Sequence, residues 1–296
     1  MTLAPTRAAR PMRPMRPMRT TSSAGQAVDQ VVVGPLAGIG LQLVFAWRAF
    51  ASLPVALTRY RGEVARVLAE VTLGSGIFLV GGGVVGVVLL LSTLTGTEVG
   101  LEGYQGLDVI GLAPLTGFIS GYANTRELAP MVAALGFAAR IGCGFTSRIG
   151  AMRISEEIDA LEAMAIRPIP YLISTRLVAA WIVVLPLYLI GLVGTYIATD
   201  FMVTTFYGQS AGTYDHYFRT FVAPIDVIYS GIKVVVLTTV VTLIHCYHGF
   251  TASGGPEGVG RATGRAIRSS IISLTVVDIL LTLILWGADQ QVQISG

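Results

Sequence analysis

The sequence predicts an all-α polytopic membrane protein, and three observations support this fold class. The chain has 296 residues, of which 53% are hydrophobic and only 12% charged, whereas a soluble domain carries about 25% charged residues. Its mean hydropathy is +0.70. Several apolar runs reach the roughly 20 residues that a helix needs to cross the hydrocarbon core. The 35 glycines fit the same class, because small residues let helices approach closely in lipid.

The N-terminal region predicts a tail followed by a helix in the membrane interface. Within residues 1–30, Arg, Pro and Met repeat with period three. Proline at every third position excludes a helix and favours polyproline II, so we expect a disordered basic tail. A sharper interpretation is that its arginines contact anionic lipid. Residues 31–66 mix apolar runs with Trp47, Tyr60 and several arginines, which is typical of an amphipathic helix that lies in the interface.

The transmembrane domain is expected over 67–290, with about five spans and a short tail, 291–296, after it. Pro114 and Pro130 break the apolar stretch 109–151, so a short or kinked half-span is expected at 109–124, before the second crossing. The five crossings are predicted at 71–95, 127–150, 177–199, 226–247 and 270–287.

The distribution of arginine predicts the orientation. The N-terminal region and the loops near 148–176 and 261–268 hold most arginines, whereas the expected loops 96–108 and 200–224 contain only Arg219. Cytoplasmic loops are enriched in Lys and Arg. With five crossings, the N-terminus is therefore expected in the cytoplasm and the C-terminus outside, in a bacterial inner membrane.

The composition argues against an ATPase or a metal enzyme. The chain has a single lysine, Lys233, and it lies in Gly-Ile-Lys-Val, whereas a phosphate-binding P-loop needs Gly-Lys-Ser/Thr. Any ATP-driven work would therefore come from another chain, and no cofactor is expected in this one. The three histidines form no ligand pattern. Cys143 and Cys246 fall in apolar stretches and are interpreted as core residues.

A short amphipathic helix is predicted at 154–165, in a loop on the arginine-rich side. Ser155 can cap its first turn, and two glutamates then lie at the positive end of the helix dipole. Ile158, Leu161 and Ala165 share one face. The alternative is a solvated linker that merely joins two spans. The residues available to a partner are Glu156, Glu157, Asp159, Leu161 and Glu162.

Charged residues also occur inside the second apolar stretch. Charges in the hydrocarbon cost several kcal/mol unless they pair or face water. Arg126 and Glu127 do not share a helix face, so each is expected to need a partner elsewhere. Pro130 frees a backbone carbonyl, which suits a cavity lining. The alternative for Arg126 and Glu127 is a structural charge cluster at the membrane boundary. For the glycine-rich segment after Arg140, the alternative to a functional role is plain helix packing.

The block from Arg126 to Arg176 closely resembles the MlaE/YrbE permease family, the membrane subunits of Mce-linked ABC lipid transporters. The matching residues are Arg126-Glu127-Leu128-Ala129-Pro130, Ala139-Arg140-Ile141-Gly142, Ile149-Gly150-Ala151-Met152, the run from Glu157 to Met164, Pro168, Arg176 and Gly260-Arg261-Ala262-Thr263. Arg148 departs from the pattern, because the family often has a glutamate there. Ser174-Thr175 departs as well, since a proline is usual in the second position. The scarcity of lysine fits actinobacterial YrbE chains.

The resemblance implies a function and a set of partners. Two permease chains, identical or paralogous, would pair around a lipid cavity, with Arg126, Glu127, Leu128 and Arg140 as its lining or gate. A separate cytoplasmic ATPase would bind the helix 154–165 and would hold the ATP and Mg. Mce proteins would share the lipid path on the outer side. The substrate would be a lipid or another hydrophobic molecule, such as a fatty acid, a sterol or a phospholipid.

Three other functions are weighed against this one. A membrane-embedded enzyme would need converging His, Asp or Ser groups at one depth, and the sequence shows no such set. A scaffold that only anchors an Mce assembly would show no ATP-dependent lipid movement. An ion channel would need a filter motif, which the sequence lacks.

Overall fold

The computed structural model describes residues 34–73 and 83–287, and the described chain is helical without a β-strand. This confirms the predicted all-α class. The chain divides into two compact units, Met1–Leu43 and Val44–Gly296. The predictions for the tails 1–30 and 291–296 lie outside the described residues.

The helices follow one another with short connections. The first group comprises α2 (Gly34–Ala51), α3 (Leu53–Arg59), α4 (Arg61–Leu73) and α5 (Gly83–Asp108). The second comprises η2 (Ala113–Leu115), α6 (Thr116–Ala123), η3 (Asn124–Leu128), α7 (Ala129–Phe137), η4 (Ala138–Gly142), α8 (Cys143–Ile154) and α9 (Glu157–Ala163). The third comprises η5 (Ile169–Ser174), α10 (Thr175–Asp200), η6 (Phe201–Phe206), α11 (Ala211–Phe221), α12 (Pro224–Phe250) and α13 (Gly255–Trp286).

Six helical stretches of the described chain are long and apolar enough to cross a membrane. They are Gly40–Arg59, Gly83–Asp108, Ala113–Ile154, Ile169–Phe206, Pro224–Phe250 and Gly255–Trp286. The last five correspond in order to the predicted crossings, of which the first, 71–95, lies partly outside the described residues. The first of the six stretches falls within 31–66, where an interface helix is expected. Its length and composition suit a helix that crosses the membrane as well as one that lies in the interface, so the interface helix stays a prediction.

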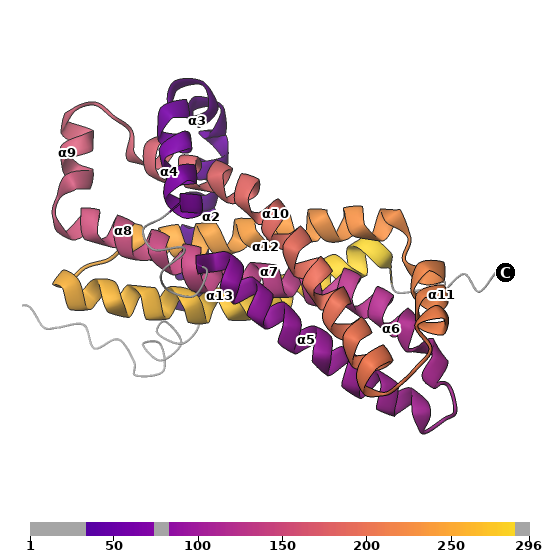
Figure 1. Ribbon diagram of the computed structural model, residues 1–296. Helices are drawn as coiled ribbons and strands as arrows, with labels where there is room; N and C mark the ends of the chain where they lie inside the picture. The colour runs from indigo at the N-terminus through magenta and orange to yellow at the C-terminus, as the bar shows by residue number, and fades with distance from the viewer. Residues whose placement is uncertain (1–33, 74–82, 288–296) are drawn as a thin grey trace, which may run out of the picture. The chain divides into compact units, whose positions relative to one another are not determined.

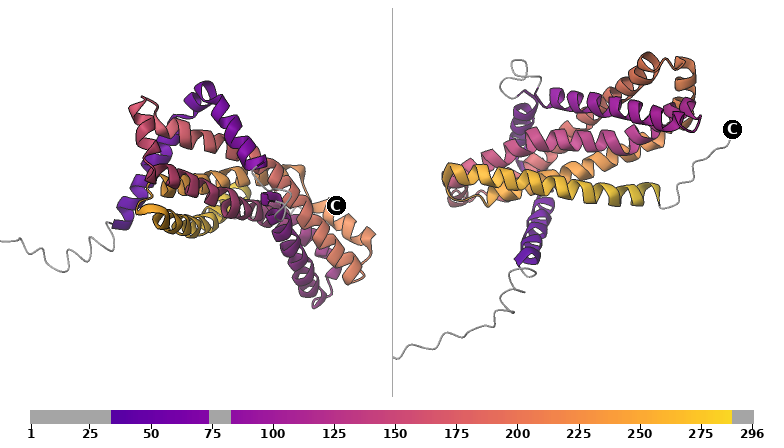
Figure 2. Two further views of the ribbon diagram at one scale, coloured as in Figure 1. Left: turned by 60° about the vertical axis from the view of Figure 1, so that its left-hand side comes forward. Right: turned by 90° about the horizontal axis from the view of Figure 1, so that it is seen from below.

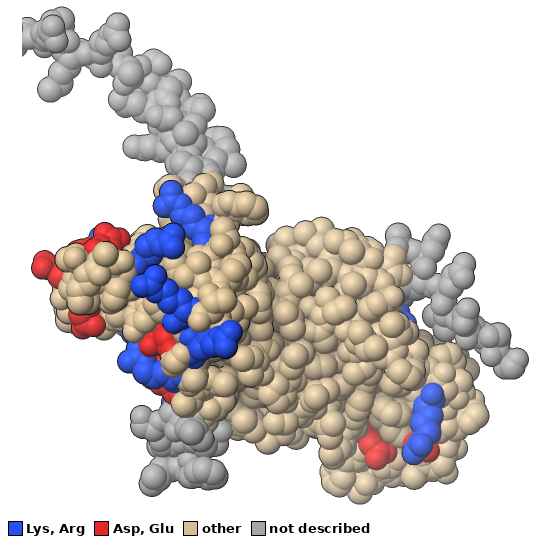
Figure 3. All heavy atoms as spheres, turned by 90° about the horizontal axis from the view of Figure 1, so that it is seen from above, with Lys and Arg blue, Asp and Glu red and all other residues tan. Residues whose placement is uncertain are grey.

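Within the unit Val44–Gly296, the long helices run lengthwise between two ends (Figures 1 and 2). α3 and α9 lie at one end, and α11 lies at the other. Basic side chains gather at the end that carries α3 and α9, whereas few charges are visible at the α11 end (Figure 3). We call the first the arginine-rich end. The arginine-rich segments of the sequence therefore lie together at one end of this unit.

The segment 96–108 is helical rather than the loop that its acidic residues predicted. Ser92, Gly96 and Gly100 recur every four residues on the buried face of α5, whereas Glu98 and Glu102 lie exposed on the other side. The helix continues because its small residues pack against α10 while its charges avoid burial. The sequence prediction was wrong here because it treated acidic residues as the end of the helix.

The prolines also interrupt the chain less than predicted. Pro114 is the second residue of the short helix η2, and Pro130 is the second residue of α7, which directly follows the π-helical turn η3. Residues 113–154 therefore form one helical stretch rather than a half-span followed by a crossing. The expected loop 200–224 likewise contains helix, in η6 and α11.

The predicted helix 154–165 is observed as α9, but its start differs. Ser155 ends α8, and its hydroxyl donates to the Ala151 carbonyl at 2.9 Å, so the predicted cap by Ser155 is wrong. Glu156 precedes α9 in the left-handed region with φ 60°, without a side-chain cap. Ile158 is fully buried and attaches α9 to the core. Ala165 lies beyond the helix end and does not share that face.

Candidate functional site

A charged cluster lies inside the helical bundle, around the single lysine of the chain. Lys233 lies midway along α12, and its side chain has 0% exposure. Its Nζ atom lies 2.7 Å from Glu127 Oε2 on η3 and 2.9 Å from Asp278 Oδ1 on α13. Three elements far apart in the sequence therefore meet at one ammonium group.

Two further oxygens complete the environment of the ammonium group. Lys233 Nζ donates to the carbonyl oxygen of Arg126 at 2.9 Å and lies 2.8 Å from Thr282 Oγ1. The Thr282 hydroxyl in turn lies 2.7 Å from Glu127 Oε1. A buried ammonium is tolerated only when such partners replace its water. The contacts meet that requirement and fix Glu127 through both carboxylate oxygens.

Proline explains why a backbone carbonyl is available to the lysine. Pro130 has no N–H, so it cannot donate to the Arg126 carbonyl four residues earlier. Lys233 supplies a donor there, and Ser230 donates to the neighbouring Thr125 carbonyl at 2.5 Å. The freed carbonyl that the sequence predicted is thus bound by α12.

A second ion pair adjoins the lysine. Arg126 Nη2 lies 3.1 Å from Asp226 Oδ2, and Trp286 Nε1 donates to the other oxygen of Asp226 at 2.6 Å. The Arg126 guanidinium also lies 4.3 Å from the ring centroid of Tyr122. A cation over an aromatic face is stabilised by the ring quadrupole. Arg126 is therefore held by Asp226 of α12 and lies against Tyr122 of α6 and Trp286 at the end of α13.

The charges of this cluster do not balance. When all five groups are ionised, two positive and three negative charges give a net charge of −1. Lys233 and Asp278 are buried, whereas the Glu127 side chain is 36% exposed. Glu127 is therefore the carboxylate through which the cluster meets its surroundings. We call Arg126, Glu127, Asp226, Lys233 and Asp278 the Lys233 cluster.

Comparison with known proteins gives the family. The model of a family described as Permease MlaE matches residues 73–284, more than half of the chain. The chain belongs to the MlaE permease family. It is a transmembrane ABC permease, a transport subunit, and the resemblance that the sequence suggested is confirmed.

Several relatives of this MlaE-family chain carry informative names. A probable ABC transporter permease protein of Rickettsia felis is 33% identical over 205 residues, which cover 66% of this chain and 76% of that protein. The intermembrane phospholipid transport system permease protein MlaE of Haemophilus influenzae is 29% identical, over 68% of this chain and 78% of that one. The chloroplastic protein trigalactosyldiacylglycerol 1 of Arabidopsis thaliana is 28% identical, over 67% and 56% respectively.

The structure of this MlaE-family chain brings only two of the four predicted cavity residues into the cluster. The expectation that Arg126 and Glu127 find partners elsewhere in the chain is confirmed. Leu128 is half-buried beside them on η3. Arg140 is exposed on η4 and does not belong to the cluster. The role of all four in a lipid cavity stays a prediction.

Sequence reasoning missed the α12 and α13 members of the cluster. Lys233 served only to exclude a P-loop, and Asp226 and Asp278 were counted within apolar spans. The signal was nevertheless present, because an ionisable residue inside a membrane span is by default a functional candidate. A lysine within an apolar span needs an acidic partner, and Glu127 lies within another such span.

The residues predicted to meet an ATPase lie on or beside α9. Leu161 is half-buried against the core, and Asp159 forms an ion pair with Arg153 of α8 at 2.7 Å. The glutamates are exposed at the arginine-rich end and are Glu156, Glu157 and Glu162. The position is compatible with docking, but their role stays a prediction.

Proposed function

We propose that this permease moves phospholipids or other hydrophobic molecules across a bacterial inner membrane, together with Mce proteins and driven by a separate ATPase. The relative from Haemophilus influenzae, named for phospholipid transport, supports the substrate class. The observation that carries the proposal is the Lys233 cluster, whose partly exposed Glu127 puts charge within spans that are otherwise apolar. Such a group can meet a polar headgroup where lipid would otherwise find only hydrocarbon.

The continuous stretch 113–154 offers a route for force. The ATPase, which would hold the ATP and Mg, would bind α9. Arg153 and Asp159 join α9 to α8, and α8 continues through η4 and α7 to Glu127. Two π-helical turns, η3 and η4, interrupt the regular hydrogen bonding along that path. Such turns often occur at functional sites, and here they suit a small shift of Glu127 relative to Lys233.

The assembly would contain a second permease chain, identical or paralogous, paired around a lipid cavity to which Leu128 and Arg140 also contribute. The arginine-rich end would face the cytoplasm by the positive-inside tendency. The Mce proteins would then bind at the α11 end. α11 bears the exposed ion pair between Asp215 and Arg219, in which the carboxylate raises the pKa of the guanidinium.

Reconstitution tests the proposed function. The permease is placed in vesicles with its ATPase and Mce partners, and transfer of a fluorescent phospholipid is followed with ATP or with a non-hydrolysable analogue. We expect transfer only with ATP. Assembly of the complete complex with no ATP-dependent transfer would instead favour a scaffold that anchors the Mce proteins.

Reversal of charge on α9 tests the coupling role. Changing Glu157→Lys and Asp159→Lys together should reduce co-purification of the ATPase at least about tenfold, because like charges at an interface cost several kcal/mol. Glu257→Lys is the matched control, since Glu257 is an exposed acid at the start of α13. Unchanged ATPase binding and lipid transfer in the double variant would show that α9 is only a linker.

A further inference from the structure

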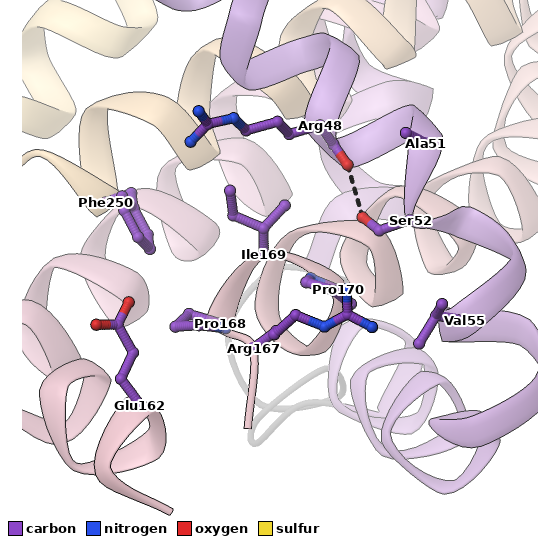
Figure 4. Close-up of a pocket in the computed structure, with 10 residues that line it drawn as sticks. All are labelled: Arg48, Ala51, Ser52, Val55, Glu162, Arg167, Pro168, Ile169, Pro170 and Phe250. Carbon is purple, nitrogen blue, oxygen red and sulfur yellow. Dashed lines mark hydrogen bonds between the residues drawn. The ribbon is translucent and has the colours of Figure 1, made fainter. Parts of the chain in front are cut away.

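A pocket of about 490 Å³ lies at the arginine-rich end, apart from the Lys233 cluster. Its walls come from the end of α2 with the start of α3, from α9 and the segment after it, and from the end of α12. The lining residues are Arg48, Ala51, Ser52, Val55, Glu162, Arg167, Pro168, Ile169, Pro170 and Phe250. Figure 4 shows these side chains around the hollow, with the two arginines coming from different segments. The volume lies within the range of small-molecule sites, about 300–1,000 Å³.

The wall formed by α2 and α3 is fixed to the helices behind it. The Ser174 hydroxyl donates to the Ala49 carbonyl at 2.8 Å and lies 2.9 Å from the Ser52 hydroxyl. The Phe45 ring packs against Phe250 with 5.9 Å between the ring centroids. These contacts join segments more than a hundred residues apart. The pocket is therefore formed before any ligand enters it.

The charges of the lining favour an anion. Arg48 and Arg167 are exposed, and within the described ranges neither guanidinium forms an ion pair with a carboxylate. By contrast, Arg66 and Arg153 at the same end are paired with Glu63 and Asp159. Glu162 is the one acid among the ten lining residues, so the lining carries a net charge of +1. Two guanidinium groups supply forked donors that match phosphate oxygens.

The surroundings favour a lipid as the source of that anion. Most of the lining is apolar, and large apolar side chains project outward from the same helices. Trp47 is 74% exposed, and Phe50 and Leu57 are exposed beside it. Aromatic and aliphatic residues interleaved with arginines are typical of a helix at the boundary between headgroups and acyl chains. Basic pockets at such a boundary bind acidic lipid headgroups.

We infer that this pocket binds the phosphate headgroup of an anionic phospholipid from the leaflet at the arginine-rich end. The guanidinium groups of Arg48 and Arg167, which point to different sides of the hollow in Figure 4, attract the anionic headgroup, and the apolar walls contact the glycerol and upper acyl chains. The bound lipid contacts α3 and the segment that joins α9 to α10. Because the site is separate from the Lys233 cluster, the inference does not rest on the proposed function.

Native mass spectrometry of the full-length chain in detergent tests the site, with phosphatidylglycerol and phosphatidylcholine as probes. We expect the wild-type chain to bind phosphatidylglycerol about tenfold more tightly than phosphatidylcholine, and the double variant Arg48→Gln with Arg167→Gln to lose that preference. The matched control is Arg59→Gln with Arg61→Gln, which removes the same charge from exposed positions outside the lining. The control should keep the preference.

Four results would overturn the inference. One is the absence of a preference in the wild-type chain, and another is an equal loss in both double variants, which would indicate unspecific attraction to the basic end. A third is displacement of the lipid by glycerophosphoglycerol at comparable concentration, which would indicate a soluble phosphate ligand. The fourth is a pocket variant that keeps the lipid preference but loses the ATPase, which would assign the pocket to a protein partner.

Discussion

Replacing Lys233 with methionine is expected to lower the free energy of unfolding by about 3–5 kcal/mol, the usual cost of removing one partner of a buried ion pair. Methionine fills a similar volume, so little cavity forms. The loss arises because Glu127 and Asp278 then face each other without a cation, and the Arg126 carbonyl loses its donor. Denaturant unfolding of the purified chain in detergent measures the change.

A second variant separates the ion pair from simple packing. Combining Lys233→Met with Asp278→Asn removes one charge of each sign and should recover about half of the lost stability, since only Glu127 then remains without a close cation. Stability of Lys233→Met equal to that of the wild type would contradict the structure of the cluster. If the recovered double variant folds but transfers no lipid, the cluster acts in transport as well as in stability.

Adding one methyl group at Gly96 is expected to destabilise the contact between α5 and α10. A Cβ atom there would lie 2.9 Å from both Ala198 Cβ and Thr195 Cα, closer than real Cβ atoms approach, and would also meet the Thr195 carbonyl. At this close approach of α5 and α10, Thr199 Oγ1 donates a hydrogen bond to the Gly96 carbonyl at 2.8 Å. Overpacking of this kind costs about 1–3 kcal/mol, and the strained hydrogen bond adds to it.

The same helix provides the control for Gly96→Ala. Gly106 also lies in α5, but a Cβ atom there would meet nothing within 4 Å. Gly106→Ala should therefore be neutral or should stabilise the helix by up to about 1 kcal/mol, because alanine has the higher helix propensity. Thermal unfolding of both variants in detergent compares them. Equal behaviour of the two variants would contradict the close approach of α5 and α10.

Periodicity and composition predicted what depends on local chemistry. Long apolar runs with few charges require helices in lipid, so the all-α class and the order of the five crossings followed directly. The spacing of Ile158 and Leu161, three positions apart, predicted the acidic helix α9. The sequence did not predict where α9 begins, since Ser155 is as suitable a residue to end α8 as to begin α9.

Charged residues misled the prediction where their environment could not be known. Glu98 and Glu102 suggested a loop, yet both lie on the exposed face of α5 while Gly96 and Gly100 pack on the other. A sequence shows that a residue is charged, but whether that charge faces outward depends on the neighbouring helix. The same holds for Pro130, whose freed carbonyl is satisfied by a lysine on another span.

The membrane class, the order of the five crossings, the arginine asymmetry and the family follow from the amino-acid sequence, because each depends on local composition or on a short motif. The place of Lys233 at the centre of a cluster with Glu127 and Asp278 follows from helix packing instead. These residues are separated by 106 positions on one side and 45 on the other, the differences between 233 and 127 and between 278 and 233. Burial forces each charge to find a partner, but the partner is chosen by which helices pack together.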